Sequence, residues 1–265
     1  LYSSAASDVY KRQAYSTAVG NSAGKISQEA HSVAIGNLAG SNAQGTNSTA
    51  VGKQAGQVSQ GAQSVAVGKS AGSGDQGANS VAIGHQAGEI SQGGQSTAMG
   101  YLAGYNAQGG GATAVGQQAA QVSQGANSTA IGRNAGSNQQ GADGVAVGIN
   151  AGRISQGAQG TAVGNLAGYN AQGASAVAIG DHAGSNQQGQ STVAVGVNAG
   201  KASQGTSSVA VGKSAGLNQQ GAQSVAIGVN AGQADQGADS VAIGEGAGSN
   251  SQSANSTAIG VFAGK

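Results

Sequence analysis

The stretch SVAIGHQAGEISQGGQ, residues 80–95, decides the fold, because variations of it fill the chain from Ser16 onward. With Ser16 taken as position 1, a new repeat begins every 16 residues, from 16 to 256, without insertion or deletion. Ala always occupies positions 3 and 8, Gly position 5 and Gln position 13. Loops usually tolerate insertions, so the constant repeat length indicates that the geometry of every repeat is constrained.

The placement of glycine within the repeat favours strands over helices. Each full repeat contains at least two glycines, and each glycine costs about 1 kcal/mol in a helix interior. Positions 1–4 are small or β-branched and precede the invariant Gly, which is typical of a short strand that ends at a tight corner. We expect a second extended stretch at positions 9–13, ended by Gly at position 14. The pattern predicts an all-β fold, a parallel β-solenoid (β-roll or β-helix) of 16-residue repeats.

Stacked coils place each residue about 4.8 Å from its counterpart in the next coil. The Gln side chains at position 13 would then form a column, in which amides either hydrogen-bond from coil to coil as a ladder or fix a turn within each coil. Both readings assign them a structural role. The fifteen residues are Gln28, Gln44, Gln60, Gln76, Gln92, Gln108, Gln124, Gln140, Gln156, Gln172, Gln188, Gln204, Gln220, Gln236 and Gln252.

The alternation of side chains along a strand separates positions 2 and 4 from positions 1, 3 and 5. The first face carries Val or Thr and Val or Ile, and the second carries almost only Ser, Ala and Gly. We expect the small face to form a thin interior and the branched face to pack on a neighbouring chain. Burial of so few small side chains offsets only part of the entropic cost of ordering a coil, so the sequence predicts an oligomer.

A weaker period leaves the length of one coil open. Position 11 alternates between apolar residues and Asn over much of the chain, beginning with Ile26, Asn42 and Val58. The coil could therefore comprise 16 residues, or 32 residues with two different corners.

The composition excludes several classes of site. The chain has 265 residues, 51 of them Gly, with no Pro or Cys, 7% charged residues and a net charge of +1. The ten basic residues are spread along the chain, which argues against nucleic-acid binding. Without Cys there are no disulfides or thiolate metal sites, and no apolar run is long enough to insert as a transmembrane helix.

The repeats define the expected domain organisation. Residues 1–15 lack the repeat and are interpreted as a leader that is artefactual or disordered, because LYSSAASDVYKRQ resembles a translated adapter sequence. Residues 16–265 are expected to form the solenoid, with fifteen full repeats and a partial one. Because the last repeat is incomplete, we expect the natural protein to be longer.

Four strand segments resemble the head repeats of trimeric autotransporter adhesins: NSTAVG (47–52), NSVAIG (79–84), NSTAIG (127–132) and NSTAIG (255–260). The resemblance covers residues 16–265. It implies a left-handed parallel β-roll, a parallel homotrimer, exposure at a bacterial surface and adhesion to host or matrix surfaces. The heptad stalk, neck and membrane-anchoring strands of that family are not seen in this sequence, so the resemblance supports the fold more than a ligand.

We therefore predict an extracellular structural or adhesive fibre segment that presents a multivalent surface at a cell surface or on a virus particle. It would assemble with itself, as a homotrimer or as an end-to-end or lateral filament. A phage or viral fibre shaft is one alternative. An ice-binding or ice-nucleation solenoid is another, although Thr occupies position 2 in only seven of sixteen repeats. Acidic residues never pair at a fixed repeat position, so we predict no enzyme activity, catalytic residue, cofactor or metal.

Three smaller signals each have a structural explanation. Asn-Ser-Thr sequons would accept N-glycans in a eukaryotic secretory pathway, but their Asn belongs to the repeat motif: Asn47, Asn127 and Asn255. The histidines occupy different repeat positions and are expected to be solvated: His31, His85 and His182. Three tyrosines are expected on the outer face, where Tyr often marks binding sites: Tyr101, Tyr105 and Tyr169.

Overall fold

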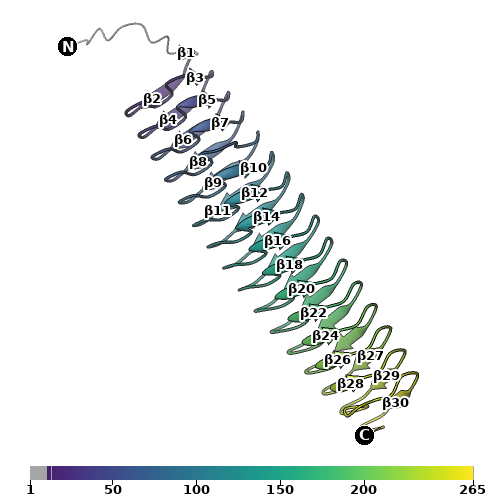
Figure 1. The fold of residues 1–265 in the computed structure, drawn as a ribbon. Helices are drawn as coiled ribbons and strands as arrows, with labels where there is room; N and C mark the ends of the chain where they lie inside the picture. Colours follow the sequence, from purple (N-terminus) through teal and green to yellow (C-terminus); the bar gives the residue numbers. More distant parts are fainter. Residues whose placement is uncertain (1–10, 13, 265) are drawn as a thin grey trace, which may run out of the picture. The chain divides into compact units, whose positions relative to one another are not determined.

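The computed structural model describes residues 11–12 and 14–264, and its regular elements are short strands joined by turns (Figure 1). The chain divides into two compact units, here called the N-terminal unit (Leu1–Gly110) and the C-terminal unit (Gly111–Lys265). Two kinds of strand alternate in both. We call those at repeat positions 2–4 the Ala strands, after their central residue, and those ending at position 13 the Gln strands.

In the described residues of the N-terminal unit there are six Ala strands, five Gln strands and β1. Its Ala strands are β2 (Thr17–Val19), β4 (Val33–Ile35), β6 (Thr49–Val51), β8 (Val65–Val67), β9 (Val81–Ile83) and β11 (Thr97–Met99). The others are β1 (Lys11–Arg12), which takes the place of a Gln strand, and the Gln strands β3 (Ser27–Gln28), β5 (Asn42–Gln44), β7 (Val58–Gln60), β10 (Ile90–Gln92) and β12 (Asn106–Gln108). Between β7 and β10, Gln76 makes only isolated parallel bridges to Gln60 and Gln92.

The C-terminal unit repeats the arrangement. Its Ala strands are β13 (Thr113–Val115), β15 (Thr129–Ile131), β17 (Val145–Val147), β19 (Thr161–Val163), β21 (Val177–Ile179), β23 (Val193–Val195), β25 (Val209–Val211), β27 (Val225–Ile227), β29 (Val241–Ile243) and β30 (Thr257–Ile259). Its Gln strands are β14 (Val122–Gln124), β16 (Asn138–Gln140), β18 (Ile154–Gln156), β20 (Asn170–Gln172), β22 (Asn186–Gln188), β24 (Ala202–Gln204), β26 (Asn218–Gln220) and β28 (Ala234–Gln236).

The strand register settles the length of the coil. Within each unit, parallel pairs join a residue to the one sixteen positions later, as in Ala34 with Ala50 and Ala130 with Ala146. One coil is therefore one 16-residue repeat. The alternation at position 11 changes a side chain from coil to coil but does not change the length of the coil. The predicted parallel β-solenoid is confirmed.

Small side chains fill the interior, as the face analysis predicts. The Ala residues at positions 3 and 8 are fully buried in nearly every coil, as Ala130 and Ala135 illustrate. Ser at position 1 is buried too, as at Ser128, and donates to the backbone carbonyl of Gly125 at 2.7 Å. By contrast, Ile131 at position 4 is 41% exposed. The branched face therefore lies on the outside of the coil.

Glycine is required at two places where successive coils approach each other. Gly52, at position 5, has φ +130°, and a Cβ there would lie 2.5 Å from the carbonyl oxygen of Gly68. Gly61, at position 14, has an ordinary φ, but its Cβ would lie 2.5 Å from the backbone nitrogen of Ala78. The first glycine turns the chain, and the second lets two backbones pass closely.

The second strand is shorter than the predicted stretch at positions 9–13. It occupies positions 11–13 and bends at position 12, where Ser59 has φ 50°. Non-Gly residues also adopt left-handed φ at positions 7 and 16, as in Leu38 (58°) and Asn47 (56°). These corners carry glycine only at Gly246 and Gly111, so the sequence gives no regular sign of them.

The predicted leader lies mostly outside the described residues. Its described part includes β1, in which Lys11 pairs with Ser27 and Arg12 with Gln28 in parallel. These residues thus follow the register of a Gln strand, although their sequence does not match the repeat.

We predict that Ala130→Leu destabilises the fold by about 1–3 kcal/mol, because the added atoms overpack a filled interior. Ile131→Leu, at the neighbouring residue on the outer face, is the control and should change the free energy of unfolding by less than about 0.5 kcal/mol. Thermal or denaturant unfolding followed by circular dichroism measures both. Equal effects would contradict the assignment of the two faces.

Candidate functional site

The features that recur in every coil are columns of side chains, one inside the solenoid and several outside. Among residues 11–12 and 14–264 there are no groups of three or more potential metal ligands of the His, Asp or Glu type. A helix able to cross the bilayer is likewise not found in that part of the chain.

The fifteen glutamines at position 13 form the interior column. All are at most 7% exposed. Each Nε2 donates to the carbonyl oxygen of position 2 in its own coil, at 2.7–3.0 Å. Many also reach the position 1 carbonyl of the next coil, as Gln156 does to Gly160 at 3.0 Å. The amide therefore bridges the interior from the Gln strand to the Ala strand.

Direct amide-to-amide contacts occur in four pairs of coils. The Nε2 of Gln76, Gln124, Gln188 and Gln236 each lie 3.2–3.3 Å from the Oε1 of the next glutamine in the column. In every full repeat with glycine at position 9, with or without such a contact, Oε1 lies against that glycine. A Cβ on Gly152, for example, would lie 2.7 Å from Gln156 Oε1. The ladder running through all coils stays a prediction.

We predict that Gln156→Glu destabilises the protein by about 3 kcal/mol at neutral pH, because a buried carboxylate would face backbone carbonyls without a donor. Gln159→Glu changes the charge equally at an exposed corner three residues later, and should have little effect. Denaturant unfolding of both variants makes the comparison. Similar losses would show that the column does not carry the stability assigned to it.

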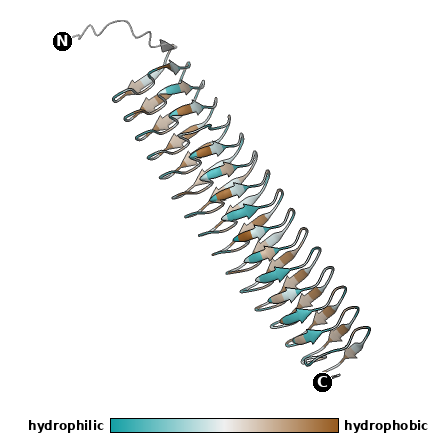
Figure 2. Ribbon diagram, in the orientation of Figure 1, coloured by the Kyte–Doolittle hydropathy of each residue, from teal (hydrophilic) through white to brown (hydrophobic). Residues whose placement is uncertain are grey.

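The outer side of the Ala strands presents what we call the apolar face, formed by the side chains at positions 2 and 4. Position 4 is exposed in nine of the sixteen described coils and half-buried in the others; Ile83 is 37%, Ile179 40% and Ile227 39% exposed. Figure 2 shows apolar residues recurring in the strands of successive coils. An exposed apolar patch that continues over many coils is typical of a surface that meets another molecule.

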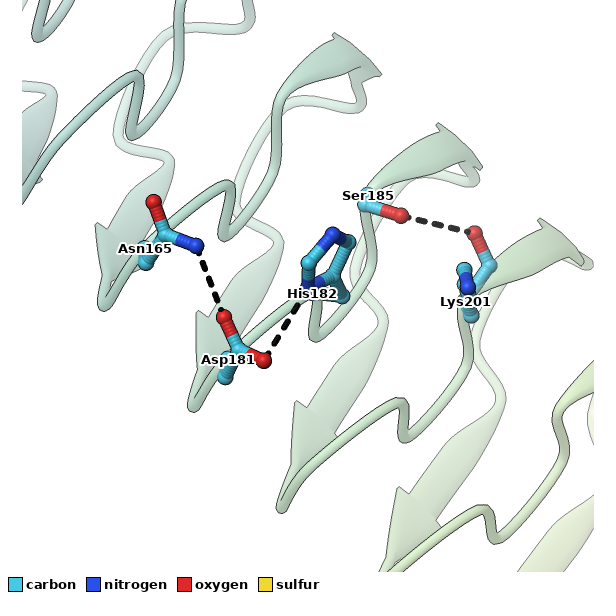
Figure 3. A network of polar contacts seen from close by, with 5 residues as sticks. All are labelled: Asn165, Asp181, His182, Ser185 and Lys201. Atoms are coloured by element: carbon cyan, nitrogen blue, oxygen red, sulfur yellow. Dashed lines mark hydrogen bonds and ion pairs between the residues drawn. The ribbon is translucent and has the colours of Figure 1, made fainter.

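Polar columns occupy the corners, and their members interact from one coil to the next. Asn134 Nδ2 donates to Asn150 Oδ1 at 3.2 Å, and Asn165 Nδ2 donates to Asp181 Oδ1 at 2.9 Å. His182 Nδ1 lies 3.1 Å from Asp181 Oδ2 (Figure 3). The hydrogen bond from Asn165, and after it that from His182, hold the pKa of Asp181 below its usual value of 3.8.

We predict that Asn165→Ala raises the pKa of Asp181 toward its ordinary value, because the largest interaction lowering it is removed. A carboxyl group with a depressed pKa in the folded state stabilises the fold above its unfolded pKa. That contribution is lost as pH falls through the folded pKa. NMR titration of the carboxyl carbon measures the shift, with Asn134→Ala as the control that should leave Asp181 unchanged.

The tyrosines and the other histidines stack on neighbours one coil away. His85 and Tyr101 stack with ring centroids 5.5 Å apart, and Arg153 lies 5.7 Å from the ring centre of Tyr169. Tyr15 and His31 stack at 5.2 Å. In the described chain no ring contact joins Tyr101 to Tyr105. Tyr101 and Tyr169 therefore each contact a residue in a neighbouring coil.

The three sequon asparagines lie at exposed corners. Asn47, Asn127 and Asn255 all occupy position 16 and have φ of 56–58°. Asn adopts left-handed φ more readily than most residues, which supports the reading that they belong to the repeat. Their glycosylation stays a prediction.

A comparison with protein families identifies the coil. The model of the YadA head domain repeat matches residues 30–55 in two copies. Comparison with curated proteins finds no match to the chain. The matched residues include the Ala strands β4 and β6 with the corners that follow them.

Proposed function

We propose that this chain, which contains YadA head domain repeats, is a segment of an adhesin head exposed at a bacterial surface. Its repeats would hold binding surfaces away from the cell and present them many times. Because the segment contains many nearly identical coils, weak contacts to a host or matrix surface would add as avidity.

The apolar face is the observation that carries the proposal. The interior is filled by Ala, Ser and Gln, so the branched side chains at positions 2 and 4 are left outside, with Ile131 and Ile179 at 41% and 40% exposure. Continuous exposure of apolar side chains in water is unfavourable by about 25 cal/mol per Å². Parallel association of three copies would cover this face in every coil at once, so we propose a homotrimer. The left-handed sense of the coil stays a prediction.

The corners fit the role of the surface that meets a ligand. Position 6 carries Asn, Lys, His, Tyr, Gln, Arg, Ile, Asp, Val or Glu in different coils, while the interior hardly changes. The scaffold thus holds varied side chains at fixed spacings, which is what a multivalent adhesive surface requires.

We predict that the double variant Ile179→Glu and Ile227→Glu dissociates the trimer, because six charges would be buried at the contact. Val197→Glu with Val229→Glu is the matched control: these valines are 44% and 43% exposed, but lie at position 6, outside the apolar face. Sedimentation equilibrium should give the mass of three chains for the wild type and the control. If the folded wild type sediments with the mass of one chain at all concentrations, the homotrimer proposal is wrong.

Adhesion itself is tested with the full chain coupled to beads and applied to host cells or extracellular matrix. Beads carrying the wild type should adhere more strongly than beads with an equal number of dissociated Ile179→Glu and Ile227→Glu chains, because avidity depends on assembly. If the wild-type beads adhere to none of the surfaces tested, a purely structural shaft is favoured.

A further inference from the structure

Coil stacking gathers basic side chains that are far apart in the sequence. Lys53, Lys69, His85 and Tyr101 all occupy position 6 of four successive coils. The backbone nitrogens of the following residues fix this register, since Ser70 donates to the Lys53 carbonyl at 2.9 Å and Gln86 to the Lys69 carbonyl at 2.9 Å. Neighbouring members of the column are therefore about one strand spacing apart, ~4.8 Å. We call this column the basic stripe.

The charges of the basic stripe are not neutralised by partners. Lys53 and Lys69 are exposed, and in the described part of the chain neither forms an ion pair. The two residues before them in the column, Asn21 and Asn37, are neutral. Like charges placed directly opposite on adjacent strands destabilise a sheet. An anion that bridges the two ammonium groups would relieve this repulsion.

An aromatic ring lies at the other end of the basic stripe. Tyr101 stacks on His85 at an interplanar angle of 19° and is still 46% exposed. Stacking holds the ring in place, so less side-chain entropy is lost when a ligand packs against it. The stripe thus combines two exposed cations, an imidazole and an ordered aromatic ring in four successive coils.

We propose that the basic stripe binds a sulfated polysaccharide. Such a polymer is linear, and its acidic groups recur at intervals comparable to the spacing of the coils. Its sulfates would contact the ammonium groups of Lys53 and Lys69, and a sugar ring would pack on Tyr101. Duplex nucleic acid fits less well, because proteins that bind it commonly contact about 6–10 phosphates. The inference names a partner for the proposed adhesin head. It rests on the proposed function, because only a head exposed at the surface would meet such polymers.

The test compares two double variants of the full chain for binding to immobilised heparin. Lys53→Gln with Lys69→Gln removes two charges from the stripe. Arg133→Gln with Lys213→Gln removes two charges from the same repeat position, where the neighbours in the column are uncharged: Gln117, Ile149, Val197 and Val229. The first should weaken binding about tenfold, as expected for two exposed ionic contacts, and the second less than about twofold. If both double variants weaken heparin binding equally, binding depends on the net charge of the protein and not on the basic stripe.

Tyr101→Ala separates ring packing from charge. It should weaken heparin binding about threefold to tenfold without changing the salt dependence, whereas Tyr169→Ala should have no effect. Desulfated heparin should not bind. Competition by single-stranded DNA that equals competition by soluble heparin would overturn the assignment to a polysaccharide.

Two controls make the outcome unambiguous. Circular dichroism shows whether each variant keeps the fold, and the charge changes lie at exposed corners where little loss is expected. Sedimentation of the same samples reports assembly. If the protein is a trimer and all variants bind heparin equally, the basic stripe is refuted and the proposed function stands. If the protein is a monomer whose heparin binding depends on Lys53 and Lys69, the basic stripe stands and the proposed trimeric adhesin is refuted.

Discussion

The backbone hydrogen bonds between successive coils, which hold strand residues in register with those sixteen positions later, constrain the rest of the structure. They fix the repeat length, because one inserted residue would put every later side chain out of its column. They also demand close passage of neighbouring backbones, which excludes a Cβ at Gly52 and Gly61. Once this register is set, the interior holds no side chains larger than Ala, Ser and the single Thr192 in the described residues, apart from the extended amide of glutamine.

The thin interior determines where the remaining chemistry lies. Branched residues such as Ile131 cannot fit inside and form an apolar face, while charged and aromatic residues occupy the corners. In the proposed function, assembly and ligand contact would therefore use different sides of the same coil. Residues at the corners can change without disturbing the Ala strands, because their side chains contact mainly the same position in adjacent coils, as Asn165 and Asp181 do.

Much of the fold could be predicted from the sequence, since Ala at position 3, Gly at position 5 and the constant spacing each have a direct geometric meaning. The bend at Ser59 could not, because nothing in the residue type demands its left-handed φ. The basic stripe was also missed. Lys53 and Lys69 look scattered along the chain, and they become neighbours only when sixteen residues are known to make one coil. The partner of Gln156 was likewise hidden, since a carbonyl eleven residues earlier has no sequence signature.

Because the interiors of the coils are nearly identical, the gene can gain or lose whole repeats. Because Ala130 and Ala146 have equivalent surroundings, a duplicated stretch of DNA encoding one complete repeat would insert a coil whose upper and lower neighbours fit as before. Lengthening or shortening in whole-repeat steps therefore leaves the fold unharmed, whereas any other indel breaks it. The length of the solenoid and the number of its corners can thus be altered by recombination alone, without a single new amino-acid substitution.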